Sequence, residues 1–417
     1  MTALVIERAR LVTGTGGPLR GAALGALRVI EDAAVAVAAG RIREIGSTRE
    51  LAARHPAAER LDAAGRALLP GLVDCHTHVV YAGSRIGEFE RRLAGESYQQ
   101  IAASGGGILV TVAATRAAGL DRLVDESTPR LRQMLRLGTT AVEIKSGYGL
   151  DLETELRMLA AIERLDAALP LDLVPTLLAA HVVPPEYAGR AGDYVDHVID
   201  KLLPAARQWH ARSRFAARGV PLACDVFCER GTFDVAQSRR LLAAARALGL
   251  PVRAHVDQFE ALGGLDAALD LAAVSVDHLE ASTPESLQRL ARSSTVGVVM
   301  PAASFHLGQR YANARALVDA GGLLALCTDC NPGSAPCPSL PLAMAIACRY
   351  QKLRPAEALN AATVNAAHVL GLGAEVGSVE VGKQADLLLL DCRDWRELAY
   401  SFGGNPVAAV VKNGRLV

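Results

Sequence analysis

Two histidines, His76 and His78, lie two residues apart in the stretch "GLVDCHTH". In an extended strand, residues i and i+2 point to the same face, so the two imidazoles would converge. Neutral imidazoles bind Zn²⁺ and other first-row metals, and two of them make half of such a site. The preceding run "ALLPGLVDC" is too apolar for an exposed edge strand. This favours a metal site over two surface histidines, with the other ligands supplied by distant parts of the chain.

The elements that must position such ligands are strands of a barrel. Between residues 67 and 373, apolar runs alternate with helical stretches such as "DLETELRMLAAIERLD" and "DVAQSRRLLAAARALG". This alternation predicts βαβ units and a parallel sheet. The runs are "GLVDCHTH", "TTAVEIKSGY", "LDLVPTLLAAH", "PLACDVFCE", "PVRAHVDQ", "VSVDHLE", "TVGVVMPAA" and "GLLALCTD". Eight runs are what a closed (β/α)₈ barrel of the TIM type requires.

Chemistry in such a barrel occurs at the carboxyl ends of the strands. The polar residues at those ends are His76 and His78 (first run), Lys145 and Tyr148 (second), His181 (third), His255 (fifth), His278 (sixth) and Asp329 (eighth). Five histidines and an aspartate on one rim predict a metal-dependent hydrolytic site. The remaining histidines fall in expected helices or loops, and we assign them no chemistry: His55, His197, His210, His306 and His368.

Short β-rich pieces at both ends of the chain predict a second, smaller lobe. "ALVIERARLVTG" and "AAVAVAAGRIREIG" lie near the start, and "GSVEVGKQADLLLLD" and "NPVAAVVKNGRLV" have a similar texture near the end. We therefore expect an α/β chain in which residues 1–66 and 374–417 form one small β-sandwich lobe. Residues 67–373 would form the barrel.

The composition points to a small-molecule partner. The 417 residues carry 44 Lys and Arg against 44 Asp and Glu, so no basic excess indicates nucleic acid. Charged residues at positions 7 and 8 interrupt the start of the chain before an apolar core of signal-peptide length, and no run is suited to crossing a membrane. Eight cysteines are too dilute for a disulfide framework. We expect a cytoplasmic protein, and a homodimer, although no residue pattern determines the oligomeric state.

The motifs resemble the amidohydrolase superfamily, in which HxH ends the first strand, a histidine the fifth and an aspartate the eighth. The likeness spans the whole chain and includes "LLPGLVDCHTH", "ALNAATVNAAHVLGL" and "GSVEVGKQADLLLLD". Within the superfamily, the chain is similar to the imidazolonepropionase family in "HTHVVYAGSR", "SGGGI", "EIKSGYGL", "AAH", "AHVDQF", "DHLE" and "TDCNPGSAP". This resemblance implies hydrolysis of a cyclic amide, 4-imidazolone-5-propanoate, to N-formimidoyl-L-glutamate in histidine degradation.

The resemblance also implies roles for individual residues. One Zn²⁺ or Fe ion per chain would be held by His76, His78, His255 and Asp329. Substrate contacts would fall on Arg85, Tyr148, His181, Gln258, Asn331, Gly333 and Ser334. Some members of the superfamily carry a glutamate, proposed as a base, three residues after the fifth-strand histidine, where this chain has Gln258. Because glutamine cannot take a proton at neutral pH, general-base duty would pass to Asp329 or His278, and Gln258 would position substrate or water.

These roles combine into an expected mechanism. The metal would lower the pKa of bound water from about 15.7 to near 7, so that hydroxide attacks the ring carbonyl. Asp329 would carry the proton to the departing nitrogen, and His278 would stabilise the oxyanion. Arg85 would grip the propionate through a planar two-point contact.

Two further features carry expectations of their own. Lys145 is expected to have a structural or electrostatic role rather than to bridge two metals as a carboxylated lysine. Three glycines in residues 103–108 are consistent with a mobile lid or with an ordinary tight turn.

Two alternatives stay open at this stage. The chain could be another amidohydrolase that acts on a neutral heterocycle, such as a base deaminase, or a non-catalytic amidohydrolase-like scaffold. The intact ligand set argues against the scaffold.

Overall fold

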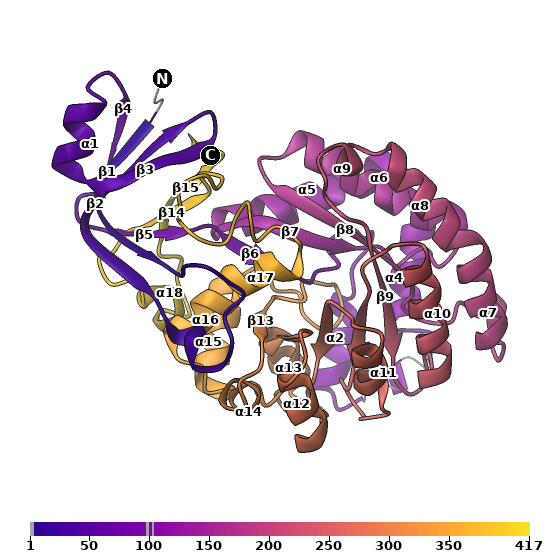
Figure 1. Cartoon of the computed structure of the whole chain (residues 1–417). Coiled ribbons are helices and arrows are strands. Elements are labelled where there is room, and N and C mark those ends of the chain that lie inside the picture. The colour runs from indigo at the N-terminus through magenta and orange to yellow at the C-terminus, as the bar shows by residue number, and fades with distance from the viewer. Residues whose placement is uncertain (1–3, 97–99, 102–103) are drawn as a thin grey trace.

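The computed structural model of the chain describes residues 4–96, 100–101 and 104–417. Its strands form two sheets, one in a barrel and one in a smaller lobe beside it (Figure 1). Strands from the beginning and the end of the chain come together in the lobe, and the middle of the chain builds the barrel. The predicted fold class, an α/β barrel with a lobe built from both chain ends, is confirmed.

The barrel sheet consists, within the described residues, of eight parallel strands in chain order. They are β6 (Leu72–Asp74), β7 (Thr139–Lys145), β8 (Asp172–Ala180), β9 (Ala223–Cys228), β10 (Arg253–Val256), β11 (Ser275–His278), β12 (Val296–Val299) and β13 (Leu324–Leu326). Each strand lies in one of the eight predicted runs. Every strand is buried along its whole length, apart from the half-buried Phe227, which explains why these runs are mostly apolar.

The barrel closes just beyond the ends of its first and last strands. A parallel bridge joins Thr77 to Cys330, the His78 amide donates to the Cys330 carbonyl at 2.9 Å, and the Asp329 amide donates to the His76 carbonyl at 3.2 Å. Closure therefore brings the HxH segment and the aspartate of the eighth run, more than 250 residues apart in sequence, into direct contact.

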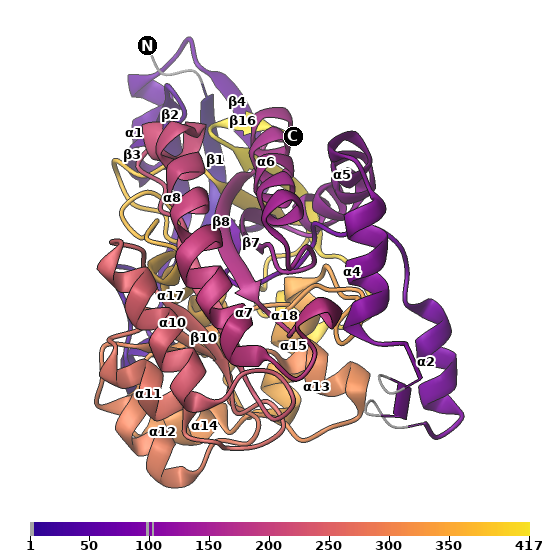
Figure 2. The ribbon, with the colours of Figure 1, turned by 90° about the vertical axis from the view of Figure 1, so that its right-hand side faces the viewer.

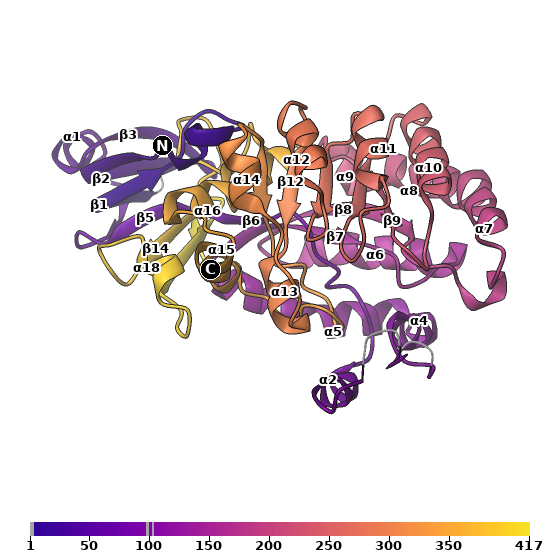
Figure 3. The same cartoon turned by 90° about the horizontal axis from the view of Figure 1, so that it is seen from below.

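Helices surround the barrel strands (Figures 2 and 3). The helices that follow the lobe strands and barrel strands along the chain are α1 (Thr48–Arg54), α2 (Ile86–Leu93), α4 (Ile108–Ala117), α5 (Leu120–Arg136), α6 (Leu152–Ala168), α7 (Ala191–His197), α8 (Leu203–Arg212), α9 (Arg214–Ala217), α10 (Val235–Ala247), α11 (Gly264–Asp270), α12 (Pro284–Ala291), α13 (Pro301–Leu307), α14 (Ala314–Asp319), α15 (Leu340–Tyr350), α16 (Pro355–Ala361), α17 (Val364–Val369) and α18 (Glu397–Tyr400). Three short helical turns occupy Gly21–Gly25, Pro185–Tyr187 and Val198–Leu202.

Local sequence signals explain where these helices start and which face they bury. In α6, Asp151 caps the first turn by accepting from the Thr154 amide at 2.8 Å, and residues such as Met158, Ile162 and Leu165 form the buried stripe. In α10, Asp234 begins the helix with a capping box. Burial of such stripes against the strands makes the barrel one continuous core.

The lobe is one mixed sheet of, within the described residues, eight strands. Its members are β1 (Leu4–Thr13), β2 (Arg28–Ala38), β3 (Arg41–Ser47), β4 (Glu59–Asp62), β5 (Ala67–Pro70), β14 (Leu387–Leu390), β15 (Val407–Lys412) and β16 (Arg415–Leu416). All are linked by hydrogen bonds into a single sheet rather than the two separate sheets of a sandwich. The long strands β1 and β2 contain register shifts, and bulges of this kind bend a sheet so that it can enclose its own core.

The strand pairing refines the expected division of the chain. β5 pairs with β1 and β14 in the lobe sheet although it lies in the expected barrel range. We propose that the lobe comprises residues 1–70 and 374–417 and that the barrel comprises residues 71–373. Of the helices the structure describes, none has the length and apolar character that a membrane crossing would require. The expected lid, 103–108, begins at a residue outside the described ranges.

Candidate active site

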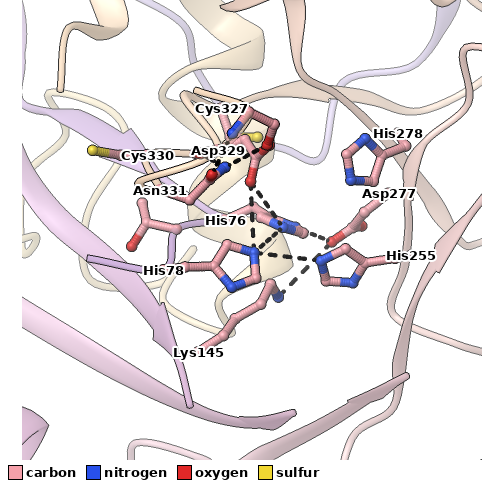
Figure 4. A network of polar contacts seen from close by, with 12 residues as sticks. His76, His78, Lys145, His255, Asp277, His278, Cys327, Asp329, Cys330 and Asn331 are labelled. Carbon is pink, nitrogen blue, oxygen red and sulfur yellow. Dashed lines mark hydrogen bonds and ion pairs between the residues drawn. The ribbon is translucent and has the colours of Figure 1, made fainter. Parts of the chain in front are cut away.

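Three imidazoles meet at the carboxyl-terminal rim of the barrel. The Nε2 atoms of His76 and His78 lie 3.2 Å apart, and those of His78 and His255 lie 3.5 Å apart. All three side chains are buried, and Figure 4 shows them pointing toward one another and toward Asp329. Ligands bound at about 2.0–2.1 Å in a tetrahedral zinc site are about 3.3 Å apart, so these distances fit the donor set of one small metal ion.

Two carboxylates hold the rings in the orientation that metal binding needs. His76 donates from Nδ1 to Asp277 Oδ2 at 2.6 Å, and His255 donates from Nδ1 to Asp225 Oδ1 at 3.1 Å. Each contact places the ring proton on Nδ1, so that Nε2 presents its lone pair to the centre of the rim. Burial is the main cause that lowers the pKa of both His76 and His255, which keeps the rings neutral.

Asp329 completes the cluster from the last strand. Its Oδ1 lies 3.7 Å from His76 Nε2 and 3.5 Å from His78 Nε2. Burial raises the pKa of Asp329 to about 7, and its backbone has φ of 55°, an uncommon conformation for a residue with a side chain. Converging lone pairs beside a buried carboxylate are unfavourable without a cation, so the donor set fits a metal ion.

His278 lies beside this cluster, and its pKa is raised, whereas the pKa values of His76 and His255 are lowered. Its ring centre is 5.4 Å from that of His255, and its Nδ1 lies 3.5 Å from Glu280 Oε2. Burial opposes protonation of His278, but the attraction of Glu280 outweighs it and raises the pKa. The backbone φ of 90° turns the ring at the end of β11. An imidazolium here is suited to donating a hydrogen bond or a proton.

A cavity of about 360 Å³ opens above the cluster. It is lined by most of the residues that the sequence singled out, namely His78, Arg85, Tyr148, His181, His255, Gln258, His278, Asp329, Asn331 and Ser334. His76 and Gly333 are not among its lining residues, although Gly333 lies against Arg85. Within the described residues, the five histidines without an assigned role do not line it: His55, His197, His210, His306 and His368.

Arg85 is held in place on the cavity wall by two neighbours. Its Nε and Nη2 donate to Glu88 Oε2 at 2.9 and 2.7 Å, and the side chain is 6% exposed. A Cβ at Gly333 would lie 2.0 Å from Arg85 Nη1. The glycine is therefore needed because the guanidinium passes directly over the backbone. Glu88 also accepts from the Gly107 amide at 2.8 Å, which ties this arginine to the glycine-rich segment.

The polar groups of the turn after β13 form hydrogen bonds with one another. The Asn331 side chain accepts from the amides of Gly333 and Ser334, both at 2.8 Å, and donates to the Asp329 carbonyl at 2.7 Å and to Ser334 Oγ at 2.8 Å. These bonds orient the segment that carries Asp329. The substrate contacts expected of Asn331, Gly333 and Ser334 stay predictions, and Asn331 and Ser334 do line the cavity.

Tyr148 and His181 face the cavity from the neighbouring strand ends. His181 donates from Nδ1 to the Gly147 carbonyl at 3.0 Å, which leaves Nε2 as an acceptor, and burial lowers its pKa to about 3. Gly147 has φ of 103°, and a Cβ there would lie 2.7 Å from the Leu178 carbonyl oxygen. The "SGYGL" segment is thus a tight loop that only glycine permits at this point.

Sequence reasoning missed Glu155, which holds that loop. Its buried carboxylate accepts from the amides of Gly147, Gly149 and Leu150 at 2.8 to 3.1 Å. The available signal was an acidic residue on the otherwise apolar, buried face of a helix. Glu229, directly after β9, was also missed; it accepts from the Phe259 amide at 2.8 Å and so orients the segment after Gln258.

Sequence reasoning also missed Asp225 and Asp277, the carboxylates behind the imidazoles. Both lie inside otherwise apolar barrel strands, which is the signal that could have identified them. Lys145 lies between them: its Nζ is 2.8 Å from Asp225 Oδ2 and 4.0 Å from Asp277 Oδ2. The ammonium is thus an ion-pair partner of these acids.

The barrel, its rim of imidazoles and the cavity above them define a hydrolase of the amidohydrolase superfamily. Residues 232–417 match the amidohydrolase family, and residues 33–58 match the imidazolonepropionase-like composite domain of bacteria. The imidazolonepropionase of Chloroflexus aggregans is 57% identical over 99% of this chain and 98% of its own length, and that of Herpetosiphon aurantiacus is 52% identical over 99% and 96%. The chain belongs to the imidazolonepropionase family.

Solved structures show the same fold at lower sequence identity. Guanine deaminase from E. coli superposes with a TM-score of 0.73 at 16% identity, covering 100% of this chain and 99% of that one. An adenosine deaminase from Xanthomonas campestris, solved with bound zinc, gives a TM-score of 0.71 at 23% identity, covering 100% and 92%. These likenesses concern the fold alone.

Proposed function

We propose that the chain hydrolyses the cyclic amide of 4-imidazolone-5-propanoate to N-formimidoyl-L-glutamate, a step in histidine degradation. The observation that carries this proposal is a single cavity with a metal-ligand set at its floor and the buried cation Arg85 in its wall. Hydrolysis of the ring needs the first feature, and recognition of the propionate needs the second.

We propose that His76, His78, His255 and Asp329 hold one Zn²⁺ or Fe ion per chain. When bound, such an ion polarises a carbonyl and lowers the pKa of water so that water can attack at neutral pH. Asp225 and Asp277 support this arrangement by keeping the two imidazoles neutral and oriented.

The protein's own groups would move the protons. Asp329, at the edge of the ligand cluster and facing the cavity, can accept a proton from the attacking water and return it to the departing ring nitrogen. His278, whose pKa is raised, can donate to the oxygen that becomes negative at the attacked carbon. Gln258 has no proton to exchange at neutral pH, and we propose that it orients substrate or water from the cavity wall.

Substrate binding would centre on Arg85. Glu88 orients the guanidinium on the cavity wall, and we propose that the propionate binds this guanidinium, with Tyr148 and His181 contacting the ring. We propose that Asn331, Gly333 and Ser334 supply further substrate contacts; Asn331 also orders its own turn, and the glycine makes room for the arginine. The Ser334 hydroxyl lies 3.4 Å from Asp329 Oδ2 and would position that carboxylate.

The test compares two substrates and two proteins. A charged hydrogen-bonded contact contributes about 1.5–3 kcal/mol, so Arg85→Met should lower kcat/KM for imidazolone propionate by about 10- to 100-fold while metal content is unchanged. An analogue without the carboxylate should be poor with the unaltered enzyme and lose little more in the variant. Equal losses for both substrates would contradict the role of Arg85.

The same experiment addresses the competing function. Neutral purine and pyrimidine bases assayed alongside imidazolone propionate should show no comparable turnover. Rapid deamination of a neutral base, with no hydrolysis of imidazolone propionate, would replace this proposal with the base deaminase.

We further propose that the protein works in the cytoplasm as a homodimer. The described cysteines are all free thiols, as expected in a reducing compartment. Phe305 and Phe402 are exposed and line the same surface hollow, and an apolar patch of this kind would suit contact with a second copy. Sedimentation of the purified protein tests the dimer.

A further inference from the structure

A buried ion cluster lies directly beneath the three imidazoles. Lys145 Nζ is 2.7 Å from Glu143 Oε1, 2.8 Å from Asp225 Oδ2 and 4.0 Å from Asp277 Oδ2. The side chains of these four residues are inaccessible to solvent. Figure 4 shows Lys145 reaching toward Asp277 from below the histidines. The proposed reaction does not use this lysine, so its burial needs another explanation.

Without the lysine, the surrounding groups have the composition of a cation site. His76, Asp225 and Asp277 each offer a ligand atom, and these atoms all lie within 4.8 Å of one another. Ligands placed about 2.0–2.4 Å from a common ion meet this condition. Glu143 adds a further carboxylate at the position of the ammonium. The carboxylates are distinct from the ligands of the first site, whereas His76 belongs to both sets and would offer Nδ1 here only after losing the proton that it shares with Asp277.

We propose that the Lys145 ammonium is a built-in cation that occupies the place of a second metal ion and so limits the chain to one metal. The inference rests on the metal site proposed above and not on the identity of the substrate. In this position the ammonium neutralises Asp225 and Asp277, which remain free to accept the Nδ1 protons of His255 and His76.

The electrostatics of the cluster support a permanent ammonium. Burial alone would lower the pKa of Lys145, but the attraction of Asp225, Glu143 and Asp277 outweighs it and raises the pKa above the ordinary lysine value. Carboxylation of a lysine requires the neutral amine and would add a negative group among these acids. The cluster therefore favours an ammonium over a carboxylated lysine that bridges two metals.

The cluster also has one supporting cation outside the proposed site. Arg253 Nη1 lies 3.5 Å from Glu143 Oε1, and the same nitrogen donates to the Cys75 carbonyl at 3.2 Å. Arg253 can partly balance the charge of Glu143 when the lysine is removed. In the ion pairs described, Arg253 joins neither Asp225 nor Asp277, although its charge favours the ionised form of Asp277. In a dry interior the two carboxylates would recruit a cation.

The test is the metal content of variants that remove the ammonium. Lys145→Met keeps the length of the side chain but not its charge. Glu143→Gln/Lys145→Met removes one charge of each sign and leaves His76, Asp225 and Asp277 intact, so it remains informative if the single variant fails to fold. Each purified protein is titrated with Zn²⁺ or Mn²⁺, dialysed and analysed for bound metal and for melting temperature.

We expect the unaltered protein to retain one equivalent and the folded variants to retain two, with a melting temperature that rises further on metal addition. Lys145→Arg should retain one, because the charge is kept. Lys412→Met is the matched control: it removes another buried lysine paired with two aspartates, but no imidazole joins that cluster. Its metal content should be unchanged.

The outcomes separate the two proposals. An unaltered protein that binds no metal would contradict the proposed function. One equivalent in the unaltered protein and also in the folded double variant would overturn the built-in cation alone. A second equivalent that appears in Lys412→Met as readily as in the Lys145 variants would overturn it as well, since the extra binding would not depend on the His76 cluster.

Discussion

At the scale of single residues, the site depends on nitrogen lone pairs held within 3.2 to 3.5 Å of one another. The rings cannot adopt this arrangement by themselves, because each neutral imidazole has two tautomers that present different atoms. Hydrogen bonds to Asp225 and Asp277 select one tautomer for His255 and His76. A ligand residue and its partner therefore act as a unit.

The first prediction concerns a ligand. His255→Ala should weaken metal binding by more than about 100-fold, since even changes in the outer partners of metal ligands cost about 10–100-fold. Activity should be lost while the fold persists, because the apolar barrel core does not include this ring. Elemental analysis, circular dichroism and the ring-opening assay measure these effects.

The control for that prediction is His368→Ala, which removes an exposed imidazole on α17. It should retain metal and activity. A His255→Ala protein with full metal occupancy and normal turnover would contradict the ligand assignment.

The second prediction separates orientation from proton transfer. Gln258→Ala should slow turnover by up to about 10-fold, the value of one neutral hydrogen bond, and Gln258→Glu should remain active. Asp329→Asn should lose about 10²–10⁴-fold through proton transfer alone, and more through weaker metal binding. Steady-state kinetics on metal-loaded proteins measures both. Equal inactivation by Gln258→Ala and Asp329→Asn would show that the division of roles is wrong.

At the scale of elements, the strand ends carry the reactive side chains, and buried polar residues order the loops that follow. The loop between β7 and α6 is organised by Glu155 from within the helix, and the turn after β13 is organised by Asn331 from within the turn. In both segments a side-chain oxygen, rather than solvent, accepts hydrogen bonds from the backbone amides. As a result, Tyr148 and Asp329 are presented to the cavity on ordered backbone.

The third prediction follows from this organisation. Glu155→Ala should destabilise the protein by at least about 2 kcal/mol, because three backbone amides lose their buried acceptor. The KM should rise more than kcat falls, because the loop positions Tyr148 for binding rather than for proton transfer. Urea unfolding and steady-state kinetics measure the two effects.

A neighbouring glutamate on the same helix provides the comparison. Glu153 is 86% exposed at its side chain and pairs only with Arg157 among its described contacts. Glu153→Ala should change the free energy of unfolding by less than about 0.5 kcal/mol. Similar losses in both variants would indicate a helix effect rather than a loop effect.

At the scale of the whole molecule, the lobe and the barrel are joined by a buried lysine. Lys412 of β15 donates from Nζ to Asp386 and to Asp172, each at 2.6 Å. Asp172 begins the barrel strand β8, at the end opposite the imidazole rim, and Asp386 precedes β14 in the lobe. This ion cluster connects the two sheets at a distance from the chemistry.

The fourth prediction is that Lys412→Met lowers the stability of the protein by about 3–5 kcal/mol at neutral pH, because two buried carboxylates lose their partner. Burial opposes the charge on Lys412, but Asp386 and Asp172 outweigh it and raise the pKa. The folded state then holds the proton more tightly than the unfolded chain. The stabilisation is complete below about pH 10.4 and decreases as the pH rises through the raised folded pKa.

Urea unfolding measured across that pH range tests whether the stabilisation by Lys412 decreases as the pH rises. The difference in stability between the unaltered protein and Lys412→Met should be largest near neutrality and should narrow above about pH 10.4. The exposed Lys352 gives the control, Lys352→Met, which should leave both the stability and its pH dependence unchanged. A difference that widens with rising pH would refute the assignment.

Much of the molecule could be predicted from sequence because barrel chemistry is arranged locally along the chain. The strands end close in sequence to the site residues that they carry: β10 ends at Val256, β11 at His278 and β13 at Leu326. An apolar run followed by His255, His278 or Asp329 therefore already gives the strand and the position on the rim. The HxH spacing determines that His76 and His78 share a face, because a strand alternates its side chains. The motifs were sufficient to indicate the family before any distance was known.

The tertiary structure decided the contacts that join residues distant in sequence. His76 and Asp277 are 201 positions apart, and His255 and Asp225 lie on different strands, so their pairing depends on the closure and register of the barrel. The same holds for Lys145 with Asp225 and Asp277, whereas Glu143, two residues away on β7, shares its face through strand alternation. Distances of 3 Å follow from the rotation of each strand and the rotamer of each side chain, and packing across the whole barrel determines both.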